Sequence, residues 1–445
     1  MSLSFDGLTF ITRCGIFMTA IAARELMPPL CVDLDGALIR SNLLLEALLR
    51  LVGRNPLYLF MAMLWLLRGR AILKGQVAAR IELNPAALPY DSELLEWLRS
   101  ERARGRDLWL YSEANERLAT AVTGHLGIFE GVVGGNQVVG DGRFDYCDRE
   151  RRDRARWRPL LRALRPHQWI KNVLLFVPLL AAHRAGNLAA LATTLLAFVA
   201  FSLCASAVYI LNDLLDLESD RKHPRKASRP FASGDATIAS GLLLIPILFG
   251  AAATVTAFLP VNFRLVLGVY FALTLAYSLN LKRRVLLDAM ALAALYTLRI
   301  IAGATATSIA LSFWLLLFSV FLFLSLAFAK RFAELDDLRR QHLLHAAGRG
   351  YRTEDLPILR SMGTASGYLS VLVLALYINS PDVGALYHRP KVIWLLCIAM
   401  LYWISRLWVV AQRGKLHDDP VIYAMQDRVS LLTGLLAAFI IGAAI

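Results

Sequence analysis

The part of the chain after Arg165 is dominated by apolar segments that are long enough, or nearly long enough, to cross a bilayer. A transmembrane helix needs about 20 apolar residues, because its backbone polar groups can only be satisfied internally. The chain is 57% hydrophobic and only 18% charged, with a mean hydropathy of +0.52, so we expect a multi-pass membrane protein. The nine predicted spans centre on Val173–Ala185, Ala190–Leu211, Gly241–Leu259, Phe263–Tyr277, Leu286–Ala304, Ala310–Ala329, Ser366–Ile378, Val392–Val410 and Leu431–Ile445.

Basic residues gather in alternate loops and indicate which side of the membrane each loop faces. The loops after the second, fourth and sixth segments are rich in Lys and Arg, whereas the loops between them are nearly bare. Cytoplasmic loops carry such an excess, so we expect these loops and the N-terminal domain on the cytoplasmic side of the cell (inner) membrane. The net charge of +14 lies at segment ends, which argues against a nucleic-acid-binding surface.

Three aspartates follow the second apolar segment at a spacing that suits a metal ion. Asp213, Asp216 and Asp220 are at positions i, i+3 and i+7, which share one face of a continuous helix. Clustered acids beside lipid are costly, and Mg²⁺ binds a few carboxylates together with substrate phosphates. We therefore expect the three aspartates to bind Mg²⁺ and act on a diphosphate, with Asn212 assisting.

Basic residues near this motif are candidates for binding phosphate groups. Arg225, Lys226 and Arg229 come just after the aspartates, and Lys282 follows Tyr277 at the end of the fourth segment. Such side chains can neutralise phosphate charge that a metal leaves unbalanced. Lys282 has a second interpretation, as a topology anchor.

Ionisable residues at or inside the other segments need a partner or a function. Asp288 could bind metal or orient a ribose hydroxyl, and Arg299 could pair structurally or contact substrate. Lys171, near the start of the first segment, either contacts a lipid phosphate or anchors the helix. Lys330 and Arg331, at the end of the sixth segment, are further candidates for binding substrate.

The pattern Asn-Asp-x-x-Asp-x-x-x-Asp at Asn212–Asp220 resembles the mark of the UbiA-type membrane prenyltransferase superfamily, carried on the second of nine helices. The stretches 165–172, 223–230, 277–282 and 330–331 are similar to the branch typified by decaprenyl-phosphate phosphoribosyltransferase. The resemblance extends from Arg165 to the C-terminus.

This resemblance implies an all-α membrane domain over 165–445 and Mg²⁺-dependent transfer of 5-phosphoribose from phosphoribosyl diphosphate to a polyprenyl phosphate. The region around Lys282 is basic, where an aromatic prenyltransferase has more aspartates, and two anionic substrates need more cations than one. Prenyl transfer from a polyprenyl diphosphate to an aromatic or other lipophilic acceptor is the rival interpretation. A transporter fits less well, because its ionisable groups would lie near the bilayer midplane. A homo-oligomer is left open.

Residues 28–157 alternate between predicted strands and helices, as in an α/β domain, and residues 1–27 stay unassigned. Asp33 and Asp35 end one predicted strand, and Ser112 ends another. These signals resemble the first two motifs of haloacid-dehalogenase-type hydrolases. The resemblance implies that Asp33 is a nucleophile, Asp35 an acid/base and Ser112 a phosphoryl contact.

Other parts of such a hydrolase are missing from the sequence. Ala37 stands where a threonine is usual, and no lysine occurs between Gly75 and Pro166 to supply the third motif. The acids available for the fourth motif lie among arginines, a poor environment for a metal. We expect a truncated, degenerate domain for docking or regulation, with a phosphatase for the lipid product as the alternative. The acids in question are Asp145, Asp148 and Asp153.

One apolar stretch lies inside this α/β domain. Pro56–Leu67 is flanked by Arg54 and Arg68 and is too short to span a bilayer. We therefore expect an interfacial helix that lies against the membrane surface.

Overall fold

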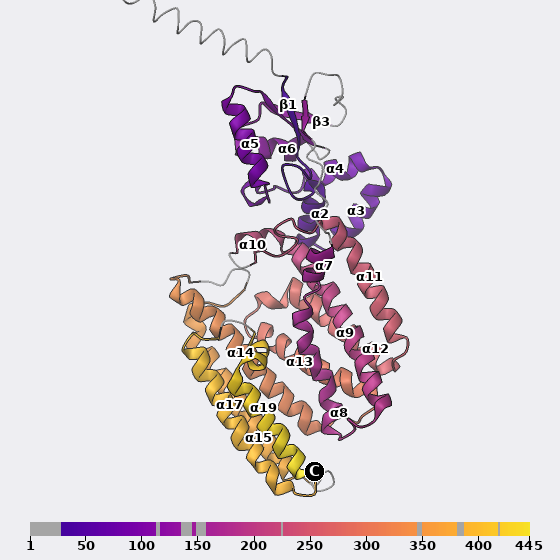
Figure 1. Ribbon diagram of the computed structural model, residues 1–445, viewed down its shortest axis with the longest axis vertical. Helices are drawn as coiled ribbons and strands as arrows, with labels where there is room; N and C mark the ends of the chain where they lie inside the picture. The colour runs from indigo at the N-terminus through magenta and orange to yellow at the C-terminus, as the bar shows by residue number, and fades with distance from the viewer. Residues whose placement is uncertain are drawn as a thin grey trace, which may run out of the picture. The chain divides into compact units, whose positions relative to one another are not determined.

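The chain divides into two compact units, and Figure 1 shows their helices and strands. The first unit comprises Met1–Leu164 and Tyr209–Ile245, and the second comprises Arg165–Val208 and Pro246–Ile445. The computed structural model describes residues 28–112, 116–134, 145–147, 157–223, 226–344, 349–380, 387–416 and 419–445.

Within the described residues, the first unit contains a four-stranded parallel sheet with the order β3-β2-β1-β4. β1 pairs with β2 from Leu30 opposite Leu108 to Asp33 opposite Tyr111, so both strands end at the same edge. The strands are mostly apolar, as expected for a parallel sheet covered on both faces. They are β1 (Leu30–Asp33), β2 (Leu108–Ser112), β3 (Gly131–Gly134) and β4 (Asp145–Cys147).

Helices connect and cover these strands. Asn42 and Asp91 cap α2 and α5 by accepting the N–H groups of Leu45 and Leu94, which fixes where each helix begins. The strand and helix order agrees with the expected α/β domain, and the haloacid-dehalogenase assignment stays a prediction. The helices are α2 (Leu43–Arg54), α3 (Tyr58–Leu67), α4 (Arg70–Ala78), η1 (Pro85–Ala87), α5 (Ser92–Ala103), α6 (Glu116–Leu126), α7 (Trp157–Ala163) and α10 (Leu217–Lys222).

The short helix α3 exposes an apolar surface. Leu59, Phe60 and Leu67 are exposed, whereas Trp65 is buried against the rest of the unit. At 1.5 Å per residue, its ten residues are too short to cross a bilayer. This geometry agrees with the expected interfacial helix, although contact with a membrane stays a prediction.

The second unit is a bundle of apolar helices around α13 (Leu287–Thr307), which packs against α12, α14 and η2. Two long helices, α9 (Leu188–Leu215) and α11 (Ile238–Thr256), belong partly to each unit. The other elements are η2 (Pro166–Phe176), α8 (Val177–Ala181), α12 (Val261–Leu279), η3 (Leu281–Arg283), α14 (Phe313–Arg340), η4 (Thr353–Asp355), α15 (Leu356–Ile378), η5 (Pro390–Ile393), α17 (Trp394–Gln412), α18 (Pro420–Gln426) and α19 (Arg428–Ala444).

Seven helices of the described chain are long and apolar enough to cross a membrane, or eight if α18 and α19, bent by 80°, form one broken span. The expected count of nine is therefore not confirmed. The first expected span, Val173–Ala185, is divided between the 3-10 helix η2 and the five-residue helix α8. Pro178 lacks a backbone donor, and His183 has a positive φ of 54°, which ends the helix.

Candidate functional site

Asp213 and Asp220 converge on one basic side chain in the first unit. Asp213 lies in the last turn of α9 and Asp220 lies in α10, and both are almost fully buried. Nη1 of Arg229 lies 3.1 Å from Oδ1 of Asp213 and 2.6 Å from Oδ2 of Asp220. The three side chains, which we call the acidic cluster, carry one more negative than positive charge.

Asp216 takes a different position from the two outer aspartates. α9 ends at Leu215 and α10 begins at Leu217, so the expected continuous helix through the motif is wrong. Asp216 lies half-buried at this break, and its carbonyl accepts a hydrogen bond from the hydroxyl of Ser219 at 2.9 Å. Among the described residues, no group of three or more His, Cys, Asp or Glu side chains is arranged to hold a metal ion.

Two of the three other residues expected beside this motif lie in the described part of the chain. Asn212 precedes the first aspartate, and its carbonyl accepts the N–H of Asp216 at 2.9 Å. Lys226 is half-buried, three residues before Arg229. Arg225 lies outside the described residues, and phosphate binding by both basic residues stays a prediction.

A second polar cluster is buried where α13 and α14 pack together in the second unit. Asp288 and Arg331 are almost fully buried and form an ion pair between Oδ2 and Nε. Oδ1 of Asp288 accepts hydrogen bonds from the Tyr277 hydroxyl at 2.9 Å and from Arg331 Nη2 at 3.2 Å. Arg349 Nη1 lies 3.3 Å from the same oxygen, and Arg331 also pairs with Glu334. We call these five residues the buried arginine cluster.

This environment gives Asp288 protein partners. Both of its carboxylate oxygens are engaged by Arg331 and Tyr277, and the side chain has no exposed surface. It is therefore a structural partner of Arg331, and its expected role as a metal ligand or a ribose contact stays a prediction. Arg331 and Tyr277 are directed at Asp288 in turn, so this geometry does not favour the substrate contacts expected of them.

A third cluster joins the start of α18 to η2, α13 and α14 in the second unit. Oδ2 of Asp419 lies 2.8 Å from Nζ of Lys171 and 2.8 Å from Nζ of Lys330. The hydroxyl of Tyr296 donates to Oδ1 of Asp419 at 2.9 Å. Two ammonium groups share one carboxylate, so this lysine cluster of four residues carries a net positive charge.

Asp419 is held in its ionised form. Burial alone would raise the pKa of Asp419, but attraction to Lys330 and Lys171 and hydrogen bonds from both outweigh burial. Its pKa is therefore well below the usual range. The carboxylate fixes both amines while leaving one unit of positive charge for an anion.

Arg299, for which both structural pairing and substrate contact were expected alternatives, has protein partners. Its Nε donates to Oδ1 of Asn172 at 2.9 Å, and its Nη2 donates to the Tyr270 hydroxyl at 3.1 Å. Asn172 donates in turn to the hydroxyl of Ser202 at 2.9 Å. These contacts favour structural pairing, because they fasten η2, which carries Lys171, to α13 and α9.

Lys282 lies in η3, directly after α12. It is half-buried, and the neighbouring Arg283 and Arg284 are exposed. This pattern suits a phosphate contact and a topology anchor equally, so the role of Lys282 stays a prediction.

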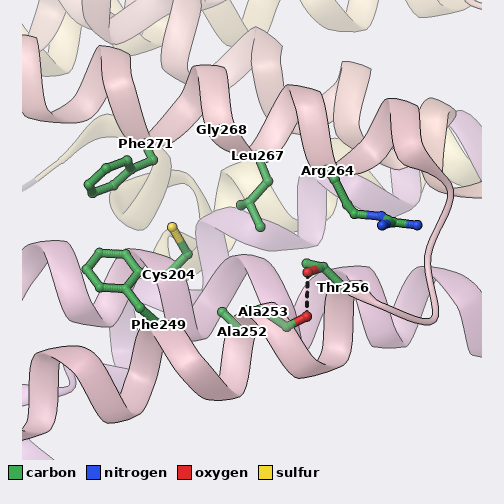
Figure 2. Close-up of a pocket in the computed structure, with 9 residues that line it drawn as sticks. All are labelled: Cys204, Phe249, Ala252, Ala253, Thr256, Arg264, Leu267, Gly268 and Phe271. Carbon is green, nitrogen blue, oxygen red and sulfur yellow. Dashed lines mark hydrogen bonds between the residues drawn. The ribbon is translucent and has the colours of Figure 1, made fainter.

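A cavity of about 350 Å³ lies among α9, α11 and α12. Figure 2 shows Phe249 and Phe271 facing each other near one end, beside Cys204, with Arg264 toward the other end. The two rings are 5.1 Å apart between centroids in an edge-on arrangement. The lining is mainly apolar and includes none of the residues expected to bind substrate, so the cavity suits hydrocarbon and not a diphosphate.

The first unit brings Asp33, Asp35 and Ser112 together at the carboxyl ends of β1 and β2. Oδ1 of Asp33 accepts the N–H of Asp35 at 3.0 Å, and Oδ2 of Asp35 accepts the hydroxyl of Ser112 at 3.3 Å. Oδ1 of Asp35 also accepts the N–H of Leu43 at 2.7 Å, at the start of α2. Asp35 therefore has a structural role at the start of α2, whether or not it acts as an acid/base.

Asp145 is excluded as the fourth hydrolase motif. It pairs with Leu30 at the amino end of β1, whereas Asp33 lies at the carboxyl end. Its carboxylate pairs instead with Arg106. The other two acids considered for this motif, Asp148 and Asp153, lie outside the described residues.

Sequence reasoning did not assign a role to Asp419. The available signal is the dipeptide Asp419-Pro420, because an aspartate followed by proline is typical of a helix start. The structure bears this out, since Asp419 accepts the N–H of Val421 at 3.1 Å. Its two lysine partners come from segments 89 and 248 residues away, which the sequence cannot reveal.

Some known proteins resemble nearly the whole chain, and others resemble only its membrane part. The sequence profile of the UbiA prenyltransferase family matches residues 173–439. The uncharacterized protein y4nM of Sinorhizobium fredii is 35% identical over 462 residues, which cover 92% of this chain and 90% of that protein. A decaprenyl-phosphate phosphoribosyltransferase of Mycobacterium tuberculosis is 34% identical over 298 residues, which cover 64% of this chain and 94% of that protein.

Solved structures also resemble the chain. A UbiA homologue from Archaeoglobus fulgidus, bound to DMAPP and Mg²⁺, has a TM-score of 0.49 and 15% identity. The alignment covers 64% of this chain and 96% of that one.

Proposed function

Because this multi-pass membrane protein belongs to the UbiA prenyltransferase family, we propose that it transfers 5-phosphoribose from phosphoribosyl diphosphate to a polyprenyl phosphate. The lysine cluster carries this proposal. Lys171 and Lys330 share a single carboxylate and leave positive charge for an anionic acceptor. Asp288, the acid at the start of α13, is neutralised by Arg331. The resemblance to the mycobacterial enzyme supports the same substrates.

The acidic cluster fits a divalent cation. Asp213 and Asp220 offer buried oxygen donors within reach of one cationic group, since Nη1 of Arg229 already contacts both. Mg²⁺ takes a few carboxylates together with phosphate oxygens, so two aspartates suffice when a diphosphate supplies the other ligands. Asp213 and Asp220 would hold the ion, with Asp216 and Asn212 beside them in the chain, and the ion would supply charge neutralisation at the diphosphate.

The residues of the chain would act by positioning and by charge. Lys171 and Lys330 would bind the lipid phosphate, which is already ionised at neutral pH and needs no general base. One phosphate oxygen forms a bond to ribose C1 while the bond from C1 to the diphosphate breaks, and pyrophosphate leaves with the electron pair. Arg229 and Lys226 would neutralise the negative charge that develops on the departing diphosphate in the transition state. Lys282 is a further candidate for a phosphate contact.

We place this reaction at the cytoplasmic face of the inner membrane. Lys282, Arg283 and Arg284 follow α12, and Arg349 and Arg352 follow α14. Cytoplasmic loops carry such excesses of basic residues. Phosphoribosyl diphosphate is too highly charged to cross a bilayer unaided, so its binding residues must lie on the side where it is made.

The test is transfer of label from phosphoribosyl diphosphate into the organic phase by the purified full-length protein with Mg²⁺ and polyprenyl phosphates of several chain lengths. Asp213→Asn should lower the rate by about a hundredfold or more, since it removes a carboxylate that would hold the cation at the departing diphosphate. The control is Asp337→Asn, which changes an exposed aspartate of α14 and should leave the rate unchanged.

A parallel reaction with labelled polyprenyl diphosphate and an aromatic acceptor separates the rival chemistry. Label that enters lipid only from phosphoribosyl diphosphate supports the proposal. Label that enters only from the prenyl diphosphate contradicts it and assigns the acidic cluster to prenyl transfer.

A further inference from the structure

The helix that carries Asp220 is held by the α/β domain through a buried ion pair. Arg221, the next residue of α10, pairs with Glu46 of α2 through both guanidinium Nη atoms, and Nη2 lies 3.2 Å from Oε2 of Glu46. The two side chains are only 8% and 7% exposed. Oε2 of Glu46 also accepts the hydroxyl of Ser41 at 2.8 Å, which fixes the carboxylate.

Arg221 links three separate segments of the first unit. Its Nη1 donates to the carbonyl of Ala87 in η1 at 3.2 Å, and its Nε donates to the carbonyl of Ala232 at 3.0 Å. Ala232 comes three residues after Arg229. The same guanidinium therefore connects the α/β domain, α10 and the segment that supplies the cation of the acidic cluster.

A second ion pair and close backbone packing hold the same region. Glu218 of α10 pairs with Arg50 of α2, and the amide of Asn84 lies 3.5 Å from its Oε1. Gly234 has a φ of +78°, and a Cβ there would lie 2.4 Å from Cβ of Arg40. The segment after Arg229 therefore approaches Arg40 of the α/β domain so closely that only glycine fits at position 234.

α10 depends on these contacts for its position. It has six residues, and isolated helices shorter than about 12 residues are marginal in water. The helix is interrupted at Asp216, where the N–H of Asp216 bonds to the carbonyl of Asn212 and the N–H of Asp220 bonds to the carbonyl of Asp216, both at 2.9 Å. The side chains that tie α10 to α2 and η1 add tertiary contacts to these backbone bonds and hold this short helix against the α/β domain.

We propose that the α/β domain is a positioning element for the acidic cluster. Two ion pairs, Glu46–Arg221 and Arg50–Glu218, form a clamp that sets the separation of Asp213 and Asp220. Through that separation the clamp determines how tightly the acidic cluster binds a divalent cation. This inference rests on the proposed function for the identity of the cation, and it gives the α/β domain a role that needs no hydrolase activity.

The test uses the more exposed pair of the clamp in the full-length protein, because its residues tolerate exchange better than the buried pair. The variants are Arg50→Glu, Glu218→Arg and the two combined. Arg102→Glu is the matched control: it reverses the charge of an arginine in the same domain, which pairs with Asp107 and Glu130 and not with α10. Glu46→Gln tests the buried pair without a change of size.

Two measurements follow each variant. Hydrogen–deuterium exchange of residues 217–223 reports how firmly α10 is held, and exchange of the sheet reports whether the domain is folded. Titration with Mn²⁺, followed by electron paramagnetic resonance, reports cation affinity without depending on catalysis. Asp213→Asn identifies the signal that belongs to the acidic cluster.

We expect each single variant of the clamp to speed exchange in 217–223 and to weaken Mn²⁺ binding about three- to tenfold, the usual size of such couplings. The combined variant should recover most of the slow exchange and most of the Mn²⁺ affinity, and Arg102→Glu should match the wild type in both. Unchanged exchange, or faster exchange with unchanged Mn²⁺ affinity, overturns the inference. Mn²⁺ binding that is indifferent to Asp213→Asn contradicts the proposed site instead, and absence of Mn²⁺ binding by the wild type contradicts both.

Discussion

A single carboxylate organises two lysines that are far apart in the sequence. Lys171 lies in η2 and Lys330 in α14, and Asp419 contacts both at 2.8 Å. Without this carboxylate, two like charges would face each other in a largely buried site, which is unfavourable. Asp419 is therefore a positioning residue: in the proposed reaction it holds the amines that bind the lipid phosphate.

Asp419→Asn should raise the KM for polyprenyl phosphate about tenfold and change kcat less, because the two amines move apart while the acidic cluster is untouched. The measurement is steady-state transfer with the lipid phosphate varied. Asp427→Asn is the matched control, since Asp427 also caps a helix, α19, but pairs with Arg406. Equal KM values in the two variants would count against a positioning role for Asp419.

The sequence predicts the residue types of the site better than their partners. The spacing of the aspartate motif singled out Asp213 and Asp220, which meet at Arg229, and their role as metal ligands stays a prediction. It did not reveal the ion pair of Asp288, because its partner Arg331 comes 43 residues later and only the packing of α13 on α14 brings the two side chains together. The spacing of residues along the sequence shows which side chains lie on the same face of a helix. Whether a distant residue neutralises a charged side chain depends on the tertiary structure.

Among the elements, long apolar helices were predictable and their interruptions were not. α12, α13 and α14 lie where apolar segments were expected, because twenty apolar residues leave few alternatives in a bilayer. The break at Asp216 and the 3-10 conformation of η2 depend on packing. Gly303 of α13 shows why, since a Cβ there would lie 1.9 Å from the carbonyl oxygen of Leu175 in η2.

Gly303→Ala should therefore push η2 away from α13 and destabilise the second unit by roughly 1–3 kcal/mol, the usual cost of overpacking. Because η2 carries Lys171, the KM for the lipid phosphate should rise as well. The thermal unfolding midpoint in detergent measures the first effect. Gly250→Ala is the control: it lies in α11 with no atom within 4 Å of the added carbon, and alanine favours the helix. Equal midpoints for the two variants would contradict the close contact.

At the scale of the whole molecule, the sequence indicated an apolar bundle joined to an α/β domain, and both are present in the described residues. It did not indicate how that domain is used. Glu46 and Arg221 are 175 residues apart, and in the sequence neither can be distinguished from any other charged residue of a helix. Their pairing comes from the folding of residues 209–245 into the same unit as the α/β domain, which no local pattern encodes.

The proposed chemistry requires that the α/β domain and the basic loops face the same side of the membrane. Single cysteines at exposed positions test this requirement. Glu96→Cys in α5 reports on the α/β domain, Arg413→Cys after α17 reports on a basic loop, and Ala310→Cys between α13 and α14 reports on a loop expected on the opposite side. The loop 308–312 carries no Lys or Arg, whereas 413–415 carries two, so the positive-inside rule predicts opposite sides for them.

A membrane-impermeant maleimide added to intact spheroplasts should label only Ala310→Cys, and all three variants should be labelled after lysis. The wild type gives the background from the native cysteines, of which Cys31, Cys204 and Cys397 are buried. Labelling of Glu96→Cys in intact spheroplasts would put the α/β domain outside the cell, where a clamp on a cytoplasmic diphosphate site could not operate. Protection of Ala310→Cys together with labelling of Arg413→Cys would invert the whole bundle and remove the acidic cluster from the compartment that supplies its substrate.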